Sequence, residues 1–360
     1  MNMKTTRQFL AFGFTMMLVA SSYATVRTVS NSPTTTIAQF STIQAAVNAS
    51  VAGDTVYVHG SPVTYSGFTI TNKQLVIIGP GWAPDKTFAF GANISGNITI
   101  TGIACSNTEI QGLACFAGQL NCSISHPNNL RFIRNQFYSN YSTVMNETGN
   151  GAYSGYTFEG NVFGAQASVS SDNSTIHLNL VFRNNYFCSN NAKIGSLGNS
   201  TSTILFDHNL WYSGGDCFGG CQFLTITNNI FVQNPAGGAS NSTFNNNITF
   251  NTANNTPWLS NGNSNGGGNI ANQDPQMTAQ AAVNAGTFNP LLDFTIAAGP
   301  ANNAGSDGKD IGLLYDATGS LNWTNSRNSR LPRVFDFTIS NPTIQPNGSL
   351  NIQVEGRKSN

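Results

Sequence analysis

The sequence predicts an all-β solenoid, because one short motif recurs between residues 130 and 251 around a shared asparagine. In most copies apolar residues stand five and three positions before that asparagine, and this alternation is typical of a half-buried strand. The copies lie 18 to 26 residues apart, a period that indicates coils buried only against their neighbours. The shared residues are Asn135, Asn161, Asn185, Asn209, Asn229 and Asn247.

Each coil is expected to turn at its asparagine. Asparagine tolerates the left-handed backbone region that a sharp bend requires, and stacked asparagine amides can hydrogen-bond from coil to coil. We therefore expect these asparagines to be structural. We also expect the aromatic residues three positions before them to stack inside the solenoid. These inward residues are Phe132, Phe158, Phe182 and Phe206.

The first 24 residues have the features of a secretory signal peptide. Lys4 and Arg7 precede an apolar stretch over residues 9–20, and residues 22–24 form a small-x-small cleavage site. A membrane anchor is the alternative, but the stretch is shorter than the roughly 20 apolar residues that a spanning helix needs. We therefore expect a secreted or cell-surface protein that does not span a membrane.

Residues 40–60 predict a short helix that caps the N-terminal end of the solenoid. Ser41 and Gln44 have the spacing of a capping box. An open solenoid end exposes strand edges and apolar core, so a covering helix is expected there. Early coils without the asparagine follow, and Gly112 is expected to take its place. The apolar face of the helix consists of Ile43, Ala46 and Val47.

These features resemble the right-handed parallel β-helices of the pectin-lyase-like superfamily. The resemblance rests on the coil length, the recurring asparagine and the amphipathic helix before the turn at Gly53 and Asp54, and it covers residues 40–315. It implies closing coils at residues 294–305 and 309–315. It does not imply one activity, because the superfamily includes lyases, hydrolases, epimerases, adhesins and phage tailspikes.

The expected organisation has three parts. The signal peptide spans residues 1–24, the right-handed parallel β-helix domain spans residues 25–319, and a small β tail spans residues 320–360. Between coils and tail, the glycine-rich run at residues 262–270 is either a last degenerate coil or a linker. The tail alternates in two runs that predict two strands. An isolated pair is marginal in water, so we expect the strands either to lie against the solenoid or to be part of a truncated surface-attachment module.

Composition argues against a nucleic-acid partner. The chain has 15 basic and 15 acidic residues, and removing the signal peptide takes away two basic ones, which leaves 13 − 15 = −2. A nearly neutral protein lacks the positive surface that DNA, RNA or an anionic membrane requires. We therefore expect no nucleic-acid binding.

Six cysteines in an exported chain predict loop disulfides. Cys217 and Cys221 form a CxxxC loop that resembles half of a metal site. No CxxC or His-x-x-x-His motif accompanies them, so a disulfide is the favoured interpretation. The other four cysteines are Cys105, Cys115, Cys122 and Cys188.

Three charged residues should stack on one outer wall of the solenoid. Glu159, Arg183 and Asp207 each stand two positions before a shared asparagine, and His208 follows Asp207. Only 8% of the chain is charged, so this column is notable. Its simplest interpretation is a salt-bridge ladder that keeps the wall soluble, with each pair contributing about 0–1 kcal/mol.

The flat wall of a β-solenoid matches an extended polymer better than a small molecule. We favour a secreted or cell-surface protein that interacts with polysaccharide without catalysis, through Glu159, Arg183 and Asp207. Exposed tyrosines such as Tyr138 and Tyr212 are candidates for stacking on sugar rings, and shielding the bases of the loops is an equal alternative.

The alternative is a pectate-lyase-like polysaccharide lyase that acts on a uronic-acid polymer by β-elimination. Lyases of the superfamily commonly hold Ca²⁺ with acidic residues, so the resemblance implies Glu159 and Asp207 as ligands of Ca²⁺, the one candidate cofactor. Arg183 is then a carboxylate clamp or base, and His208 is the better base at neutral pH. Hydrolysis ranks lower, because the repeats carry neither paired Asp-Asp nor Gly-His-Gly.

Overall fold

The computed structural model describes most of the chain beyond the predicted signal peptide, of which residues 1–23 lie outside the described residues. Within the described ranges, no helix has the length and apolarity needed to cross a membrane. The described residues are 24–34, 38–82, 90–124, 126–138, 141–144, 152–171, 173–188, 193–212, 215–233, 237–287, 289–315, 323, 333–339, 349 and 352–357.

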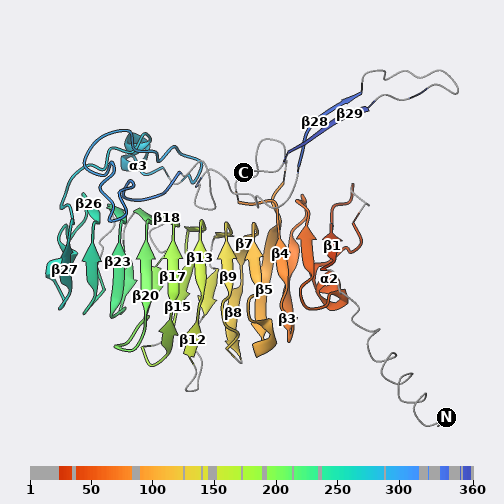
Figure 1. Cartoon of the computed structure of the whole chain (residues 1–360), viewed down its shortest axis with the longest axis horizontal. Coiled ribbons are helices and arrows are strands. Elements are labelled where there is room, and N and C mark those ends of the chain that lie inside the picture. The colour runs from red at the N-terminus through yellow and green to blue at the C-terminus, as the bar shows by residue number, and fades with distance from the viewer. Residues whose placement is uncertain are drawn as a thin grey trace, which may run out of the picture.

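The molecule is a parallel β-solenoid, as predicted, and its strands follow one another along the axis in Figure 1. One sheet, which we call the first wall, contains the strands that end before the turn of each coil. In spatial order these are β1 (Val26–Val29), β2 (Thr55–Val58), β4 (Val76–Ile78), β6 (Glu109–Gln111), β9 (Arg131–Ile133), β13 (Thr157–Glu159), β17 (Leu180–Arg183), β20 (Ile204–Asp207), β23 (Leu224–Thr227), β25 (Thr243–Asn245) and β27 (Ser264–Gly267).

The other large sheet provides two further walls. Strand β5 (Asn93–Thr101) pairs with β7 through its first residues and with β8 through its later ones, so the sheet divides there. The second wall is β7 (Ala114–Ala117), β10 (Gln136–Phe137), β14 (Val162–Gly164), β18 (Tyr186–Cys188), β21 (Leu210–Tyr212), β24 (Ile230–Val232) and β26 (Ile248–Phe250). The third wall is β8 (Gln119–Ile124), β11 (Ser142–Val144), β15 (Ser168–Ser170), β19 (Lys193–Gly195) and β22 (Phe218–Gly219).

Short elements complete the coils. Strand β3 (Tyr65–Thr71) pairs with β5, and β12 (Ala152–Ser154) pairs with β16 (Ile176–Leu178) in a loop. Two 3₁₀ turns, η1 (Ile103–Cys105) and η2 (Pro257–Leu259), lie at coil corners.

Stacked aromatic rings fill the core, as the repeat predicted. Phe158 and Phe182 have ring centroids 4.8 Å apart and Phe182 and Phe206 4.6 Å apart, with nearly parallel planes. All three are fully buried. A second stack lies beneath the second wall and runs through Phe137, Phe163, Phe187, Trp211 and Phe231.

The shared asparagines form a continuous buried ladder. In Asn185, Oδ1 accepts from the backbone N–H of Asn161 at 2.9 Å, and Nδ2 donates to the carbonyl of Phe158 at 2.9 Å and to Oδ1 of Asn209 at 3.0 Å. The same pattern repeats to Asn269, one rung beyond the six copies in the sequence. The ladder therefore supplies partners to the backbone where each coil leaves the first wall.

The left-handed bend lies one residue earlier than predicted. It falls on the residue before each ladder asparagine, for example Asn184 at φ 54° and His208 at φ 53°. Gly112, at φ 69°, occupies that bend position and not the asparagine position, which Leu113 fills by donating its N–H to Asn135 Oδ1. The asparagine is thus selected for its carboxamide, while the preceding residue takes up the backbone strain.

The cap helix is α2 (Ile43–Ala49), and its N-cap differs from the prediction. Thr42, not Ser41, caps the helix by accepting from the N–H of Ala45 at 3.2 Å. The Gln44 side chain is therefore not the second half of a capping box and bonds to β3 instead. The apolar face of α2 is buried as expected.

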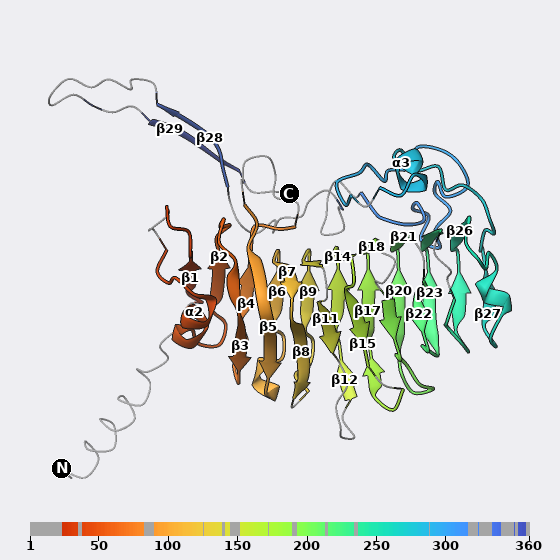
Figure 2. The ribbon, with the colours of Figure 1, turned by 180° about the vertical axis from the view of Figure 1, so that it is seen from behind.

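The coils end at Ile270, earlier than predicted. Residues 273–315, including α3 (Gln280–Asn284), form an extension that covers the outer face of the second wall and builds a second apolar cluster there. Figure 2 shows this extension lying alongside the coils and not continuing them. Alternating apolar residues of the extension pack against outward-facing strand residues such as Tyr186 and Leu210. This alternation is why the sequence of the extension resembles closing coils.

The tail forms the two predicted strands, but it does not lie against the solenoid. Strands β28 (Arg333–Ile339) and β29 (Ile352–Arg357) pair antiparallel and point away from the coils in Figure 1.

The predicted disulfides are absent, because all six cysteines are free and buried, five of them in the coil interior and Cys188 beneath the C-terminal extension. Burial raises the pKa of Cys115, Cys188 and Cys221 to about 12. Such thiols behave as small apolar side chains and are poor nucleophiles. The CxxxC spacing of Cys217 and Cys221 therefore reflects core packing.

Replacing a stacked ring should destabilise the protein strongly. We expect Phe182→Ala to lower the free energy of unfolding by about 4 kcal/mol, because it leaves a cavity between two parallel rings. Urea unfolding followed by circular dichroism measures this, with Phe90→Ala as control since Phe90 is 48% exposed. Equal losses in both variants would show that the stack is not the core.

Removing one rung of the ladder should also destabilise the protein. Asn185→Leu strands the N–H of Asn161 and the carbonyl of Phe158 in a dry turn, so we expect a loss of about 3 kcal/mol or more. Calorimetry should show a lower Tm, and any polysaccharide binding by the wild type should be retained below that Tm. Lost binding at an unchanged Tm would mean that the asparagine contacts ligand.

Candidate functional site

The predicted charged column is present on the outer face of the first wall. Glu159 on β13 pairs in register with Arg183 on β17, which pairs in register with Asp207 on β20. Three further charged residues extend it toward the N-terminus. We call the whole set the charged strip, and it consists of Glu109, Arg131, Arg134, Glu159, Arg183 and Asp207.

Each end of the strip contains an ion pair between a half-exposed arginine and a largely buried carboxylate. Arg183 Nε lies 3.0 Å from Asp207 Oδ2, and Arg131 Nη1 lies 2.7 Å from Glu109 Oε2. The Gln111 side chain donates a further hydrogen bond to Glu109. The carboxylates are therefore fixed by the wall, and the guanidinium groups face outward.

The N-terminal half of the strip was not predicted. Glu109 and Arg131 stand four positions before the turn, not two, and they pair in register on β6 and β9. Arg134 occupies the left-handed bend and is only 7% exposed. The 22-residue spacing of Glu109 and Arg131 matches the coil length, and that signal could have identified this pair from the sequence.

Glu159 lies among the arginines in the middle of the strip. Burial raises its pKa above the ordinary value, although Arg131, Arg134 and Arg183 oppose the rise. The ionised carboxylate is therefore less favourable here than in water.

Both oxygens of Asp207 are engaged. Oδ2 pairs with Arg183, while Oδ1 lies 2.9 Å from His208 Nδ1 and accepts from Asn228 Nδ2 at 3.0 Å. Burial alone would raise the pKa of Asp207, but these contacts outweigh it and hold the pKa below 3.8. Asp207 is therefore a stably ionised anchor.

His208 lies beneath the C-terminal extension. Its side chain is 1% exposed, and Nε2 lies 3.6 Å from Oδ1 of Asp307 in the extension. Asn228 accepts from the N–H of Ser306 at 2.8 Å beside it. The ring is thus enclosed between two carboxylates, which limits its access to any ligand on the first wall.

The two residues predicted as Ca²⁺ ligands are separated along the wall by the residue predicted as the carboxylate clamp. Glu159 and Asp207 occupy alternate coils, with Arg183 on the coil between them. Among the described residues, no group of three or more His, Cys, Asp or Glu side chains could hold a metal ion. The assignment of these residues to Ca²⁺ and to base chemistry stays a prediction.

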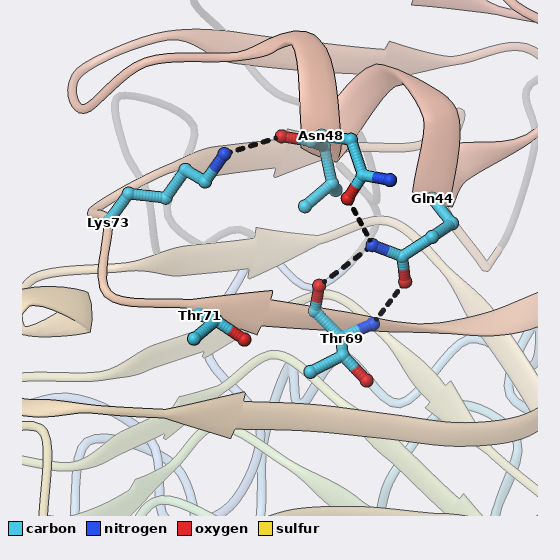
Figure 3. Close-up of a pocket in the computed structure, with 6 residues that line it drawn as sticks. Gln44, Asn48, Thr69, Thr71 and Lys73 are labelled. Carbon is cyan, nitrogen blue, oxygen red and sulfur yellow. Dashed lines mark hydrogen bonds between the residues drawn. The ribbon is translucent and has the colours of Figure 1, made fainter.

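A separate polar hollow of about 480 Å³ lies at the N-terminal cap, between α2 and β3. As Figure 3 shows, Gln44 reaches from the helix to the free edge of β3, where it accepts from the N–H of Thr69 at 2.7 Å and donates to its carbonyl at 3.1 Å. Lys73 donates to the carbonyls of Val47 and Ser50 at the end of the helix. These contacts fasten the cap and protect a strand edge, which is a structural role.

Comparison with known proteins adds no relative. No family model, curated protein or solved structure matches the chain. What the structure itself establishes is a parallel β-solenoid that presents the charged strip on its first wall.

Neutralising Asp207 should destabilise the protein in a pH-dependent way. Its folded pKa is lowered, so the ionised form stabilises the fold above pH 3.8, and this contribution is lost as the pH falls through the folded pKa. We expect Asp207→Asn to cost about 2 kcal/mol at pH 7. Urea unfolding from pH 7 to pH 3 should show the difference from wild type shrinking.

Glu159→Gln is the matched control, because ionisation of Glu159 should affect the free energy of unfolding with the opposite sign. Because the folded pKa of Glu159 is raised, its ionised form costs stability as the pH rises above the ordinary value of 4.5. We expect this variant to be as stable as wild type or slightly more stable at pH 7. A large loss at pH 7 would mean that Glu159 makes a strong pair.

Proposed function

We propose that this protein binds an extended, acidic polysaccharide along its first wall and does not cleave it. The observation that carries the proposal is the pair of outward-facing arginines. The Arg131 and Arg183 side chains are 41% and 38% exposed, while the carboxylates that hold them, on Glu109 and Asp207, are 7% and 12% exposed. An arginine oriented in this way is ready to receive a ligand carboxylate.

The guanidinium groups have donors to spare. Within the described part of the chain, Arg183 pairs with Asp207 through Nε, and Arg131 pairs with Glu109 through Nη1. The other donors of each planar fork are available to ligand oxygens. A carboxylate accepts two parallel N–H bonds from such a fork, so the geometry favours an acidic sugar over a neutral one.

The spacing of the arginines favours a chain over a monosaccharide. Arg131 on β9 and Arg183 on β17 are separated by β13. Two strand spacings correspond to about 9.6 Å along the axis, so both can engage one extended polymer but not one sugar. The ladder and the ring stacks keep this wall rigid, which lowers the entropic cost of binding.

Binding without cleavage is favoured over elimination. Elimination from a uronate needs a base that reaches the C5 proton and a cation that neutralises the neighbouring carboxylate. His208 is nearly inaccessible, and Asp207 already accepts from Arg183 and Asn228. The lyase alternative, in which Ca²⁺ binds Glu159 and Asp207, requires these contacts to be rearranged.

We also propose where the protein acts and to which superfamily it belongs. The predicted signal peptide supports a secreted or cell-surface protein. The cap helix and the asparagine ladder support membership of the pectin-lyase-like superfamily.

The test is a double variant, Arg131→Gln with Arg183→Gln. We expect it to weaken binding to polygalacturonate or alginate roughly tenfold or more at low salt, because two carboxylate forks are lost. Affinity electrophoresis measures the change. Wild-type binding should also weaken as salt rises.

The matched control is the double variant Arg333→Gln with Arg357→Gln, which removes the same two charges from the hairpin that points away from the coils. Equal losses in both variants would indicate nonspecific charge attraction and overturn the proposal. Release of unsaturated product, followed by ultraviolet absorbance with Ca²⁺ or chelator, would establish the lyase alternative.

A further inference from the structure

The second wall carries an outward column that is apolar along its length. Its members face one another coil by coil, with Tyr138 beside Phe116, Gly164 paired with Cys188, and Cys188 paired with Tyr212. The C-terminal extension covers the later members, so Tyr212 is 1% exposed and is not the surface tyrosine that the sequence suggested. Tyr138 is 40% exposed, and Phe116 is half-buried.

Phe116 lies beside Tyr138 at a register shift between β5 and β7. Strand β5 pairs Ile94 with Cys115 but Ser95 with Ala117, so Phe116 is the extra residue of β7. Bulges of this kind re-aim a side chain and are enriched near functional sites. The two rings meet edge to face, with centroids 6.0 Å apart and planes at 71°.

A glycine gives the Tyr138 ring its place. A Cβ on Gly164 would lie 2.8 Å from Cδ2 and 3.0 Å from Cε2 of Tyr138, so one edge of the ring rests on the glycine backbone. Gly164 has no left-handed backbone angle to explain its presence. The missing side chain therefore serves the position of the ring.

We propose that Phe116 and Tyr138 form a stacking subsite for a sugar ring of the bound polysaccharide. Aromatic rings with one polar end suit pyranose faces, which present C–H groups surrounded by hydroxyls. Exposed neutral side chains that can bond hydroxyls are present on the preceding coil, at Ser95 and Asn97, and on the coil of Phe116, at Gln119. The ligand class rests on the proposed function, but the site lies on a different wall from the charged strip.

The two sites differ in their response to salt. Ion pairing at the charged strip is screened as ionic strength rises, whereas stacking of uncharged faces is not. Binding to an acidic polysaccharide at high salt therefore isolates the contribution of the stacking subsite. Failure of one site leaves the other measurable.

The experiment compares Tyr138→Ala, Gly164→Ala and Tyr138→Phe by affinity electrophoresis in polygalacturonate at high salt. We expect Tyr138→Ala to weaken binding roughly three- to tenfold, through loss of the ring. Gly164→Ala should weaken it similarly, because the new methyl group displaces the ring. Tyr138→Phe should bind nearly as wild type.

The control is Phe90→Ala, which removes another exposed aromatic ring. The subsite is overturned if wild type does not bind at high salt, if Tyr138→Ala binds as wild type, or if Phe90→Ala loses as much. If Tyr138→Ala weakens binding at high salt while the Arg131 and Arg183 double variant binds normally at low salt, the subsite stands and the charged strip fails. The reverse pattern would support the charged strip and overturn the stacking subsite.

Discussion

The fold depends on one buried interaction, the carboxamide of each ladder asparagine. Each coil must bend sharply as it leaves the first wall, and the bend removes backbone groups from the sheets. The carboxamide restores partners to them, since Asn209 accepts from the N–H of Asn185 and donates to the carbonyl of Phe182. Buried backbone groups without partners would be costly, so the ladder determines where each strand ends. It thereby also aligns the residues two positions earlier, including Glu159, Arg183 and Asp207.

Charge is scarce in this chain, and its placement on the first wall is not explained by stability. Ion pairs that include a half-exposed arginine contribute about 0–1 kcal/mol because water already solvates the cation well. The pairs of Glu109 with Arg131 and of Asp207 with Arg183 therefore add little to a fold that already has stacked rings, and Asp207 also stabilises the fold through His208 and Asn228. The arrangement is easier to explain as a means of orienting guanidinium groups.

Periodicity predicted the features that repeat and missed those that do not. The Phe182 stack, the Asn185 ladder and the register of Arg183 with Asp207 follow from spacing alone. Alternation in residues 294–315 showed that one side is apolar, but not that it packs on the outside of the coils. The enclosure of His208 depends on Asp307, 99 residues later, and no local pattern encodes that contact. The six cysteines suggested disulfides, whereas pairing depends on distances that the sequence does not contain.

The C-terminal extension changes how the solenoid can come apart. A simple solenoid is held by neighbouring coils only, so it can fray one coil at a time from either end. Here Leu314 bonds to Asn184, Ser306 to Asn228, and Ala304 to Asn246, so one segment crosses several coils and can dock only after they have formed. These coils consequently become a single cooperative block. The coils before Asn161 are not crossed by the extension in this way, but Trp82 ties them to the block by donating to the carbonyl of Gly160. Hydrogen exchange along the axis would thus be graded at the N-terminal end and uniform toward the other.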